Sequence, residues 1–336
     1  KVYGTDYVDI VEVWGYKETD VSAFSTNNNI TKAYIELTST NFDTRIDEVL
    51  QYYPNCGDIY LFDDGSVNKL DYMFSNGGHN NAHGTRQQVK SVTFMDGYFD
   101  NLRLFNWVFI SCQELIAVNN IPKGITEIRS SFENCIKLNQ QFDFSDYNII
   151  YDCFDSTFQG CSSLTYTPIF PSNYTGTMKK CFYGCKSLTT APVIPNGVND
   201  IPAMFQGCTA LTTVPNIPSA CTNYNSTFYG CTSLVTVPSD GWKGNMGSTF
   251  NQCDKLNCQI NIESATNLHY TFYKCYALAY TPSLPSEATR VEMVSCFQDC
   301  TSLVTPPTIP NGVTRMTSCF QGCTSLTTAP NIPLST

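Results

Sequence analysis

The sequence predicts a repeat solenoid, an array of about ten similar units stacked in one direction. The pattern Phe-x-x-Cys-x-x-Leu recurs ten times in the 336 residues, at intervals of 22 to 26 residues. In every copy the Cys follows the Phe by three residues and the Leu follows by six. The stretch from Cys319 to Pro333 also nearly repeats the stretch from Met204 to Pro218. Such fixed internal spacing indicates one small structure built many times. The repeat Phe residues are Phe109, Phe132, Phe158, Phe182, Phe205, Phe228, Phe250, Phe272, Phe297 and Phe320.

Within each repeat the spacing predicts one helical turn and one short strand. Phe and Cys at i and i+3 lie on one face of a helical turn, so both can point into a core. Leu then opens a β-favouring run, as in Leu-Thr-Thr-Ala-Pro at 188–192. The Pro four residues past Leu ends the strand because it has no N–H to donate. A second, short extended piece precedes the next Phe.

A unit of this size cannot bury its apolar side alone, whereas stacked neighbours can. We therefore expect an α/β array with a parallel sheet, its strands about 4.8 Å apart, so that ten repeats extend on the order of 50 Å. Equivalent Phe, Cys and Leu residues should form inward-facing columns. Members of these columns include Phe182, Cys185, Leu188, Phe205, Cys208, Leu211, Phe320, Cys323 and Leu326.

The motif F-x-[GND]-C-x-[SA]-L, followed by a short strand and an Ile-Pro pair, resembles the BspA-type leucine-rich repeat. The resemblance covers about residues 100–336. It implies a right-handed, leucine-rich-repeat-like solenoid and, by association, binding or adhesion outside the cell, at a cell surface or on a virion surface. Two repeats depart from the pattern, at 132–150 and 250–265, because the Pro-terminated strand is replaced there. We expect bulges or bends at those two places.

The first hundred residues fit the repeat less well. We predict a strand-rich segment at 1–30, divergent capping repeats at 31–100 and the regular solenoid at 101–336, because a terminal repeat has one face without a neighbour. Phe74 closes a degenerate repeat that lacks Cys-x-x-Leu. Apolar residues near helical spacing predict a helix over 40–53. Because the sequence begins at Lys1, we expect it to start inside a longer chain or after a cleaved leader.

Composition limits the classes of partner. Charged residues make up 14% of the chain and the net charge is −10, whereas roughly 25% charged residues are usual. Without a basic face, nucleic acid is not expected as a partner. No run of about 18 apolar residues exists, so no membrane span is expected in this chain. The surface should be largely uncharged and polar.

Seventeen cysteines is a high number for this length. Ten belong to the repeat motif, and their equivalent positions favour a buried column in which Cys acts as a small hydrophobic residue. Cys181, Cys296 and Cys319 directly precede a repeat Phe, in a packing position that other repeats fill mainly with small residues. A disulfide framework remains the alternative. No metal site is predicted.

Other features with possible chemistry favour ordinary loops. His79 and His83 have the spacing of a zinc pair on a helix, but they lie in a Gly/Asn-rich stretch. Phe-Asp-Asp-Gly-Ser at 62–66 suits a turn better than a cation site, because the remaining ligands of a calcium loop are missing. No catalytic motif is present, so we expect neither an enzyme nor a cofactor.

The residue after the repeat Phe is never small, and it forms a predicted row of exposed side chains along the solenoid. From the third repeat onward this row contains Gln159, Tyr183, Gln206, Tyr229, Asn251, Tyr273, Gln298 and Gln321. Tyr faces beside amide groups suit neutral sugars or polar protein surfaces. A helical corner that merely needs solvated residues is the alternative. A second, Thr-rich strip on the strands includes Thr189, Thr212 and Thr327.

These features support two functional hypotheses. The first is a non-catalytic extracellular module that presents a flat polar face to a protein or glycan on a cell surface. The second is a structural component of a larger assembly, such as a phage tail, spike or virion decoration protein, whose partners are neighbouring subunits. Fold alone does not decide between them.

Overall fold

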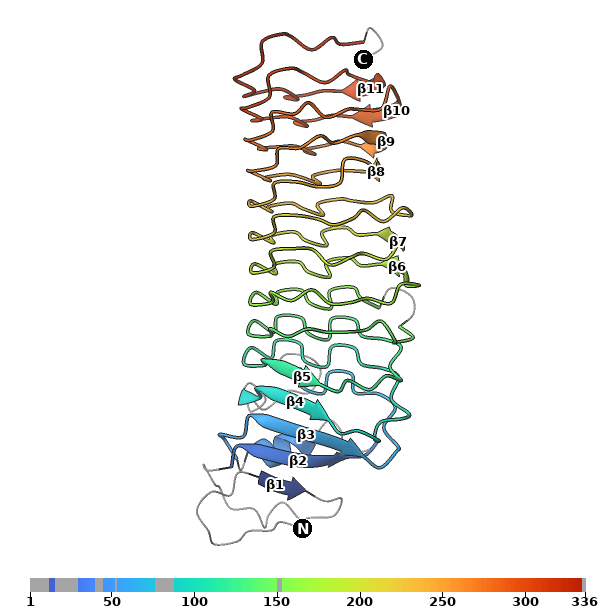
Figure 1. The fold of residues 1–336 in the computed structure, drawn as a ribbon, viewed down its shortest axis with the longest axis vertical. Helices are drawn as coiled ribbons and strands as arrows, with labels where there is room; N and C mark the ends of the chain where they lie inside the picture. The colour runs from blue at the N-terminus through green and yellow to red at the C-terminus, as the bar shows by residue number, and fades with distance from the viewer. Residues whose placement is uncertain are drawn as a thin grey trace.

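The structure is a computed structural model that describes residues 12–15, 30–39, 45–51, 53–75, 88–149 and 153–333. Figure 1 shows successive coils of the chain stacked along one long axis, with the two termini at opposite ends. The predicted solenoid is therefore confirmed. Its elements are β1 (Glu12–Gly15), β2 (Lys32–Leu37), α1 (Arg45–Leu50), β3 (Asp58–Asp63), β4 (Ser91–Phe94), β5 (Ala117–Asn119), β6 (Thr175–Thr177), β7 (Gly197–Asp200), β8 (Trp242–Asn245), β9 (Ile262–Asn267), β10 (Glu287–Glu292) and β11 (Asn311–Arg315).

The N-terminal part holds a five-stranded parallel sheet in the order β1-β2-β3-β4-β5. Every second residue of β2 and β3 is buried, as expected for strands with one face on a core. The helix predicted over 40–53 forms as the shorter α1, with Ile46 and Leu50 buried. Residues 40–44 and 52 lie outside the described part of the chain. One sheet thus connects the divergent repeats to the first regular one.

The later strands form parallel pairs, β6 with β7, β8 with β9 and β10 with β11. They correspond to the second extended piece, just before the next Phe. The strand predicted directly after Leu forms fully only as β5. In later repeats it is reduced to single bridges, from Thr190 to Thr213 and from Thr213 to Thr236. That prediction is wrong for the C-terminal repeats, because the nearby Pro cannot donate to a ladder and limits it to one residue.

The predicted helical turn around the repeat Phe is also wrong. The residue two before each Phe, such as Lys180 or Ala203, has a φ of 54° or 55°, and the residue two after it, such as Gly184 or Gly207, has a φ of 72° or 74°. Left-handed residues on both sides of the Phe rule out a continuous right-handed helix. The segment between them, here called the corner, is instead a pair of consecutive tight turns.

Hydrogen bonds between neighbouring repeats explain why the corner takes this form. Phe182 N donates to Met204 O at 2.9 Å, and Gly184 N donates to Gln206 O at 2.8 Å in the next repeat. A helix would direct these groups along its own axis, where they could not reach the next coil. The double turn directs them along the solenoid axis. The corner therefore adds a third connection between repeats, beside the two strand positions.

Phe and Cys columns fill the interior. Rings of equivalent Phe residues, from Phe74 to Phe320, stack with centroids 4.9 to 5.8 Å apart. Each repeat Cys donates its thiol to the carbonyl of the Phe in the preceding repeat, with sulfur-to-oxygen distances of 2.9 to 3.1 Å. The thiol therefore fills space and also satisfies a buried carbonyl. The Phe column also extends to Phe74, in the degenerate repeat.

Two amide side chains replace missing strand contacts. The side chain of Gln140 accepts from Val118 N at 2.7 Å and donates to Val118 O at 2.7 Å, within the irregular repeat at 132–150. Asn216 makes the same pair of bonds with the backbone of Ile194, at 3.0 and 2.8 Å. A side-chain amide carries the same donor and acceptor as a peptide group. Each one therefore stands in for a strand residue that the next repeat does not supply.

Candidate binding surface

The corner positions the predicted row of amide and tyrosine side chains. Tyr183 N donates to Lys180 O of the same turn at 3.0 Å. Tyr183 O accepts from Gly160 N of the preceding repeat at 2.7 Å. The same pattern recurs along the solenoid, for example from Gly207 N to Tyr229 O. The backbone groups of the row are thus satisfied within the solenoid. Only the side chains remain available for an external partner.

Most row side chains are half-buried rather than fully solvated. This class contains Gln159, Tyr183, Gln206, Tyr229, Tyr273 and Gln298. Gln321 is exposed, whereas Asn251 is buried at 8% exposure. The expectation of an exposed side chain is therefore corrected for Asn251. Its Oδ1 atom has no hydrogen-bond partner, and a buried acceptor without a partner is costly.

Amide and tyrosine residues alternate along this row from Gln159 to Tyr273. Gln159 Nε2 donates to Glu133 Oε1 of the preceding repeat at 3.0 Å. The Lys180 ammonium lies 5.8 Å from the centre of the Tyr183 ring. These contacts restrict the Gln159 and Tyr183 side chains. The row as a whole is uncharged.

The columns named from the sequence lie inward. Phe182, Cys185, Leu188, Phe205, Cys208 and Leu211 all have 0% exposure. In the last repeat Phe320, Cys323 and Leu326 are half-buried and pack against the same core. The Thr strip faces outward, since Thr189, Thr212 and Thr327 are exposed. Thr212 uses its hydroxyl to donate to Thr189 O at 3.0 Å, so part of this strip reinforces the stacking.

The cysteines do not form a nucleophilic site. All seventeen are thiols, and only Cys258 and Cys323 are not fully buried. Burial raises the pKa of Cys208 to about 12 and that of Cys221 to about 11, from an ordinary value of 9.0. Because the thiolate is the reactive form, these groups are unreactive near neutral pH. The column that the sequence predicted is therefore structural.

Across the described residues, no group of three or more His, Cys, Asp and Glu side chains is placed to hold a metal ion. In the 62–66 segment, Asp63 Oδ1 accepts from Phe99 N at 2.7 Å and Asp64 Oδ1 accepts from Ser66 N at 3.0 Å. The Asp64 bond is that of an ordinary turn, whereas the Asp63 bond connects this turn to the next repeat. His79 and His83 lie outside the described residues.

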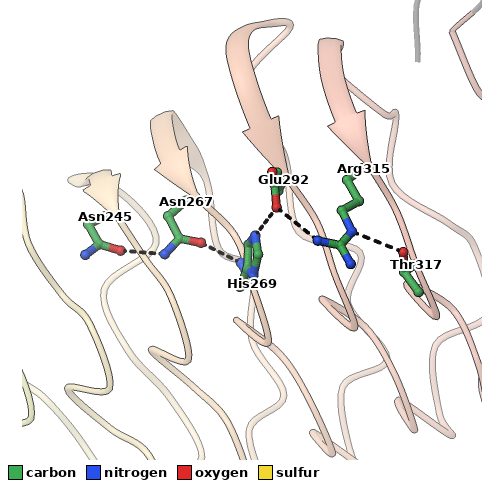
Figure 2. A network of polar contacts seen from close by, with 6 residues as sticks. All are labelled: Asn245, Asn267, His269, Glu292, Arg315 and Thr317. Carbon is green, nitrogen blue, oxygen red and sulfur yellow. Dashed lines mark hydrogen bonds and ion pairs between the residues drawn. The ribbon is translucent and has the colours of Figure 1, made fainter.

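A chain of polar contacts runs across the last four repeats, at the ends of β8 to β11 (Figure 2). Asn267 Nδ2 donates to Asn245 Oδ1 at 3.1 Å, and His269 N donates to Asn267 Oδ1 at 2.9 Å. His269 Nε2 lies 2.9 Å from Glu292 Oε2, and an Arg315 nitrogen lies 4.0 Å from the same oxygen. His269 therefore connects successive repeats rather than acting alone.

Sequence reasoning missed three corner residues. The position two after the Phe is Gly in five repeats, but it is Gln252, Lys274 and Asp299 in three consecutive ones. Their φ values are 58°, 59° and 62°, in the region where glycine is normally required. The departure from Gly is visible in the sequence. Its meaning depends on the left-handed geometry, which the sequence pattern did not reveal.

The part of the chain that the structure describes contains no helix long and apolar enough to cross a membrane.

Comparisons with known proteins agree with the repeat architecture. The family model described as BspA-type leucine-rich repeat region matches residues 102–235 and 246–334, in six copies. A second family model, described as Mycoplasma protein of unknown function, matches residues 19–121. No curated protein matches the chain.

Two solved structures illustrate the similarity. A leucine-rich repeat protein from Bacteroides ovatus is 19% identical, with 97% of this chain and 84% of that chain covered and a TM-score of 0.49. A leucine-rich cell surface protein from Faecalibacterium prausnitzii is 19% identical, with 88% and 82% covered and a TM-score of 0.46.

Proposed function

The chain belongs to the BspA-type leucine-rich repeat family, and from this premise we propose that it is a non-catalytic module that binds a protein or glycan on a cell surface. Solenoids of stacked repeats offer long lateral surfaces, and their binding residues recur at equivalent positions. The module would act outside the cell, through contacts spread over several repeats.

One observation carries the proposal, namely the row of amide and tyrosine side chains on the corners. Its backbone groups are used between repeats, as in the bond from Gly184 N to Gln206 O. Its side chains are partly ordered by neighbours, as Gln159 is by Glu133. A pre-ordered side chain loses less conformational freedom when it binds a partner. Tyrosine in particular supplies contact area and a hydroxyl at low entropic cost.

Low charge supports the same function. With a net charge of −10 on 336 residues, long-range attraction to an anionic surface is not available. Among the described residues, fifteen of the seventeen thiols are buried and no metal-binding cluster is present. Recognition would therefore depend on short-range contacts of uncharged groups.

The test compares two faces of the solenoid. Labelled wild-type protein is incubated with a panel of intact animal and bacterial cells, and bound protein is measured by flow cytometry. One variant carries Gln159→Lys, Gln206→Lys and Gln298→Lys on the row. The matched control carries Thr189→Lys, Thr212→Lys and Thr327→Lys on the Thr strip, so that both variants gain the same charge. We expect the row variant to lose at least tenfold in binding and the strip variant to keep it.

Equal loss in the two variants would show that charge alone is responsible, and a selective loss in the strip variant would move the surface to the strands. A wild-type protein that binds no cell, but forms defined oligomers by light scattering, would overturn the proposal in favour of an assembly role. Circular dichroism melting curves confirm that each variant is folded.

A further inference from the structure

One repeat places four tyrosines outside the core. Tyr270, Tyr276 and Tyr280 are 39%, 40% and 54% exposed, and Tyr273 is half-buried. In the other repeats from Phe158 onward, the position of Tyr270 holds Ser, Lys or Ala, and that of Tyr276 holds Ser, Thr, Lys or Asp. The aromatic surface is therefore specific to this repeat. Large exposed aromatic groups gathered at one place on a protein surface mark an interaction site.

The side chains around the corner of this repeat contact one another. The Tyr270 and Tyr273 rings meet edge to face, with centroids 5.7 Å apart and planes at 78°. Lys274 Nζ lies 5.2 Å from the centre of the Tyr273 ring. A hydrogen bond with Tyr273 and the nearby Tyr273 and Tyr276 hydroxyls raise the pKa of Lys274. The ammonium thus lies beside the Tyr273 ring on the surface of the solenoid.

In this corner and its two neighbours, polar side chains stand at a backbone position with positive φ. Lys274 has a φ of 59° at a position where the repeats from Phe158 to Phe228 use Gly. Gln252 and Asp299 occupy the same position in the repeats on either side, also with positive φ. These three side chains place an amide, an ammonium and a carboxylate in one column.

Residues with carboxylate side chains lie in the repeats on both sides of Lys274. Ala277 N donates to Asp254 O at 3.1 Å, and Lys274 N donates to the carbonyl of Gln298, next to Asp299, at 2.9 Å. Burial raises the pKa of Asp254, in the preceding repeat, and the attraction of Lys274 partly opposes that rise. Asp299, in the following repeat, contributes to the raised pKa of Lys274. Two acceptors and one strong donor therefore lie beside an aromatic platform. We call Tyr270, Tyr273, Lys274, Tyr276, Asp254 and Asp299 the tyrosine patch.

We propose that the tyrosine patch binds neutral hexose units of a glycan. A hexopyranose has a face of C–H groups that packs on an aromatic ring and a rim of hydroxyls that need both donors and acceptors. The tyrosine rings supply the platform, Lys274 donates, and Asp254 and Asp299 accept. Two carboxylates around one ammonium, on a chain with net charge −10, disfavour acidic sugars. This inference rests on the proposed surface function and narrows it to one repeat and one ligand class.

A protein partner fits these observations less well. Protein hot spots are usually desolvated centres surrounded by a contact ring that excludes water. The tyrosine patch is centred on a single repeat, and it includes the charged residues Lys274, Asp254 and Asp299. Such a composition suits a small polyhydroxylated ligand, which needs stacking and several hydrogen bonds within a short span.

The chain provides a matched control for the test. Tyr166 lies two residues past its repeat Leu, as Tyr280 does, and it is 51% exposed. The corner of its repeat carries Ser156 and Gly160 in place of Tyr270 and Lys274. Wild-type protein and the variants Tyr273→Ala, Tyr276→Ala and Tyr166→Ala are applied to arrays of neutral glucans, mannans and galactans, with sialylated and sulfated glycans alongside. We expect wild-type binding to at least one neutral class, at least a tenfold loss for Tyr273→Ala and Tyr276→Ala, and no change for Tyr166→Ala.

Lys274→Gly separates binding from folding. Glycine relieves the positive φ, so the melting temperature of this variant should not fall, while binding to the neutral glycan should weaken severalfold. If the variant binds as well as the wild type, Lys274 is not a ligand-binding group and the patch as proposed is wrong.

Several outcomes overturn the inference. These are no binding to any neutral glycan, preference for the acidic set, or equal loss in Tyr166→Ala. If the protein binds cells but no neutral glycan, the tyrosine patch fails and the general surface function stands. Cell binding that resists periodate, is removed by protease treatment of the cells and is lost in Tyr273→Ala would assign the patch to a protein partner instead. Binding to neither cells nor glycans would contradict both proposals.

Discussion

At the scale of single residues, the corners depend on backbone positions that disfavour a Cβ atom. In every regular repeat the residues two before and two after the Phe have positive φ, and the second of these is Gly in five repeats. Elsewhere, glycine is required because another coil lies close. Gly244 in β8 combines both reasons, with a φ of 76° and the carbonyl oxygen of Thr222 directly against the place that a Cβ would occupy. Close contact between neighbouring coils therefore limits which residues these positions can hold.

We expect Gly244→Ala to destabilise the fold by roughly 2–4 kcal/mol, because the methyl group meets a backbone carbonyl that cannot move without displacing the adjacent repeat. Gly65→Ala is the control, since Gly65 has a φ of 82° but no other part of the chain lies within 4 Å of the place its methyl group would take. It should cost only about 1 kcal/mol, from the φ alone. Urea unfolding followed by circular dichroism measures both, and equal costs would refute the close-approach explanation.

At the scale of elements, the solenoid tolerates irregular repeats because side chains complete the missing ladder. The sequence predicted a bulge or bend at 132–150. The structure shows the physical compensation, in which Gln140 bonds both backbone groups of Val118 in β5. Asn216 does the same for Ile194. Buried peptide groups that would otherwise lack a strand partner are thereby satisfied.

We expect Gln140→Ala to destabilise the protein by about 2 kcal/mol, because it leaves two buried backbone groups of Val118 without a partner. The Val118 amide should also lose protection in hydrogen exchange measured by mass spectrometry. Gln141→Ala is the matched control, because Gln141 makes an exposed bond to Thr167 O at 2.6 Å. It should change stability by less than about 0.5 kcal/mol. Unchanged exchange at Val118 in Gln140→Ala would contradict the proposed role of this amide.

At the scale of the whole molecule, each repeat contacts mainly its neighbours, and the columns extend these contacts along the full array. The thiols contribute to these columns, since all ten repeat cysteines donate a hydrogen bond to the Phe carbonyl of the preceding repeat. Their burial makes stability depend on pH. Desolvation raises the pKa of Cys208 and Cys319 to about 12, above the ordinary value of 9.0. The unfolded chain therefore loses these protons at a lower pH than the folded one.

The stabilisation by neutral thiols is fully present below about pH 9 and is lost progressively as the pH rises toward 12. Within that window each such thiol lowers the free energy of unfolding by about 1.4 kcal/mol per pH unit. We expect the urea midpoint, measured with reductant present, to be constant from about pH 7 to 8.5 and to fall steeply by about pH 10.5. For each protein, the fall is measured from its own urea midpoint at neutral pH. This fall should be smaller in Cys208→Ala than in the wild type. A midpoint that stays flat across this range would refute the account.

The sequence alone determined the repeat, its length, the inward columns and the family, because a fixed Phe-Cys-Leu spacing is a local property that any stacking must satisfy. It also located the amide and tyrosine row, whose role in binding remains a proposal. Tertiary structure alone decided the path of the corner. Phe and Cys at i and i+3 fit a helical turn or a double turn equally well, and bonds to the next coil, such as Phe182 N to Met204 O, select the double turn.

Contacts between coils also decided other features of the candidate surface that the sequence did not reveal. The burial of Asn251 and the placement of Asp254 and Asp299 in the repeats on either side of Lys274 depend on which coils are stacked together. Those neighbours are twenty or more residues away along the chain. Local spacing specifies what each repeat contributes, whereas hydrogen bonding and packing between repeats decide which contributions reach the surface.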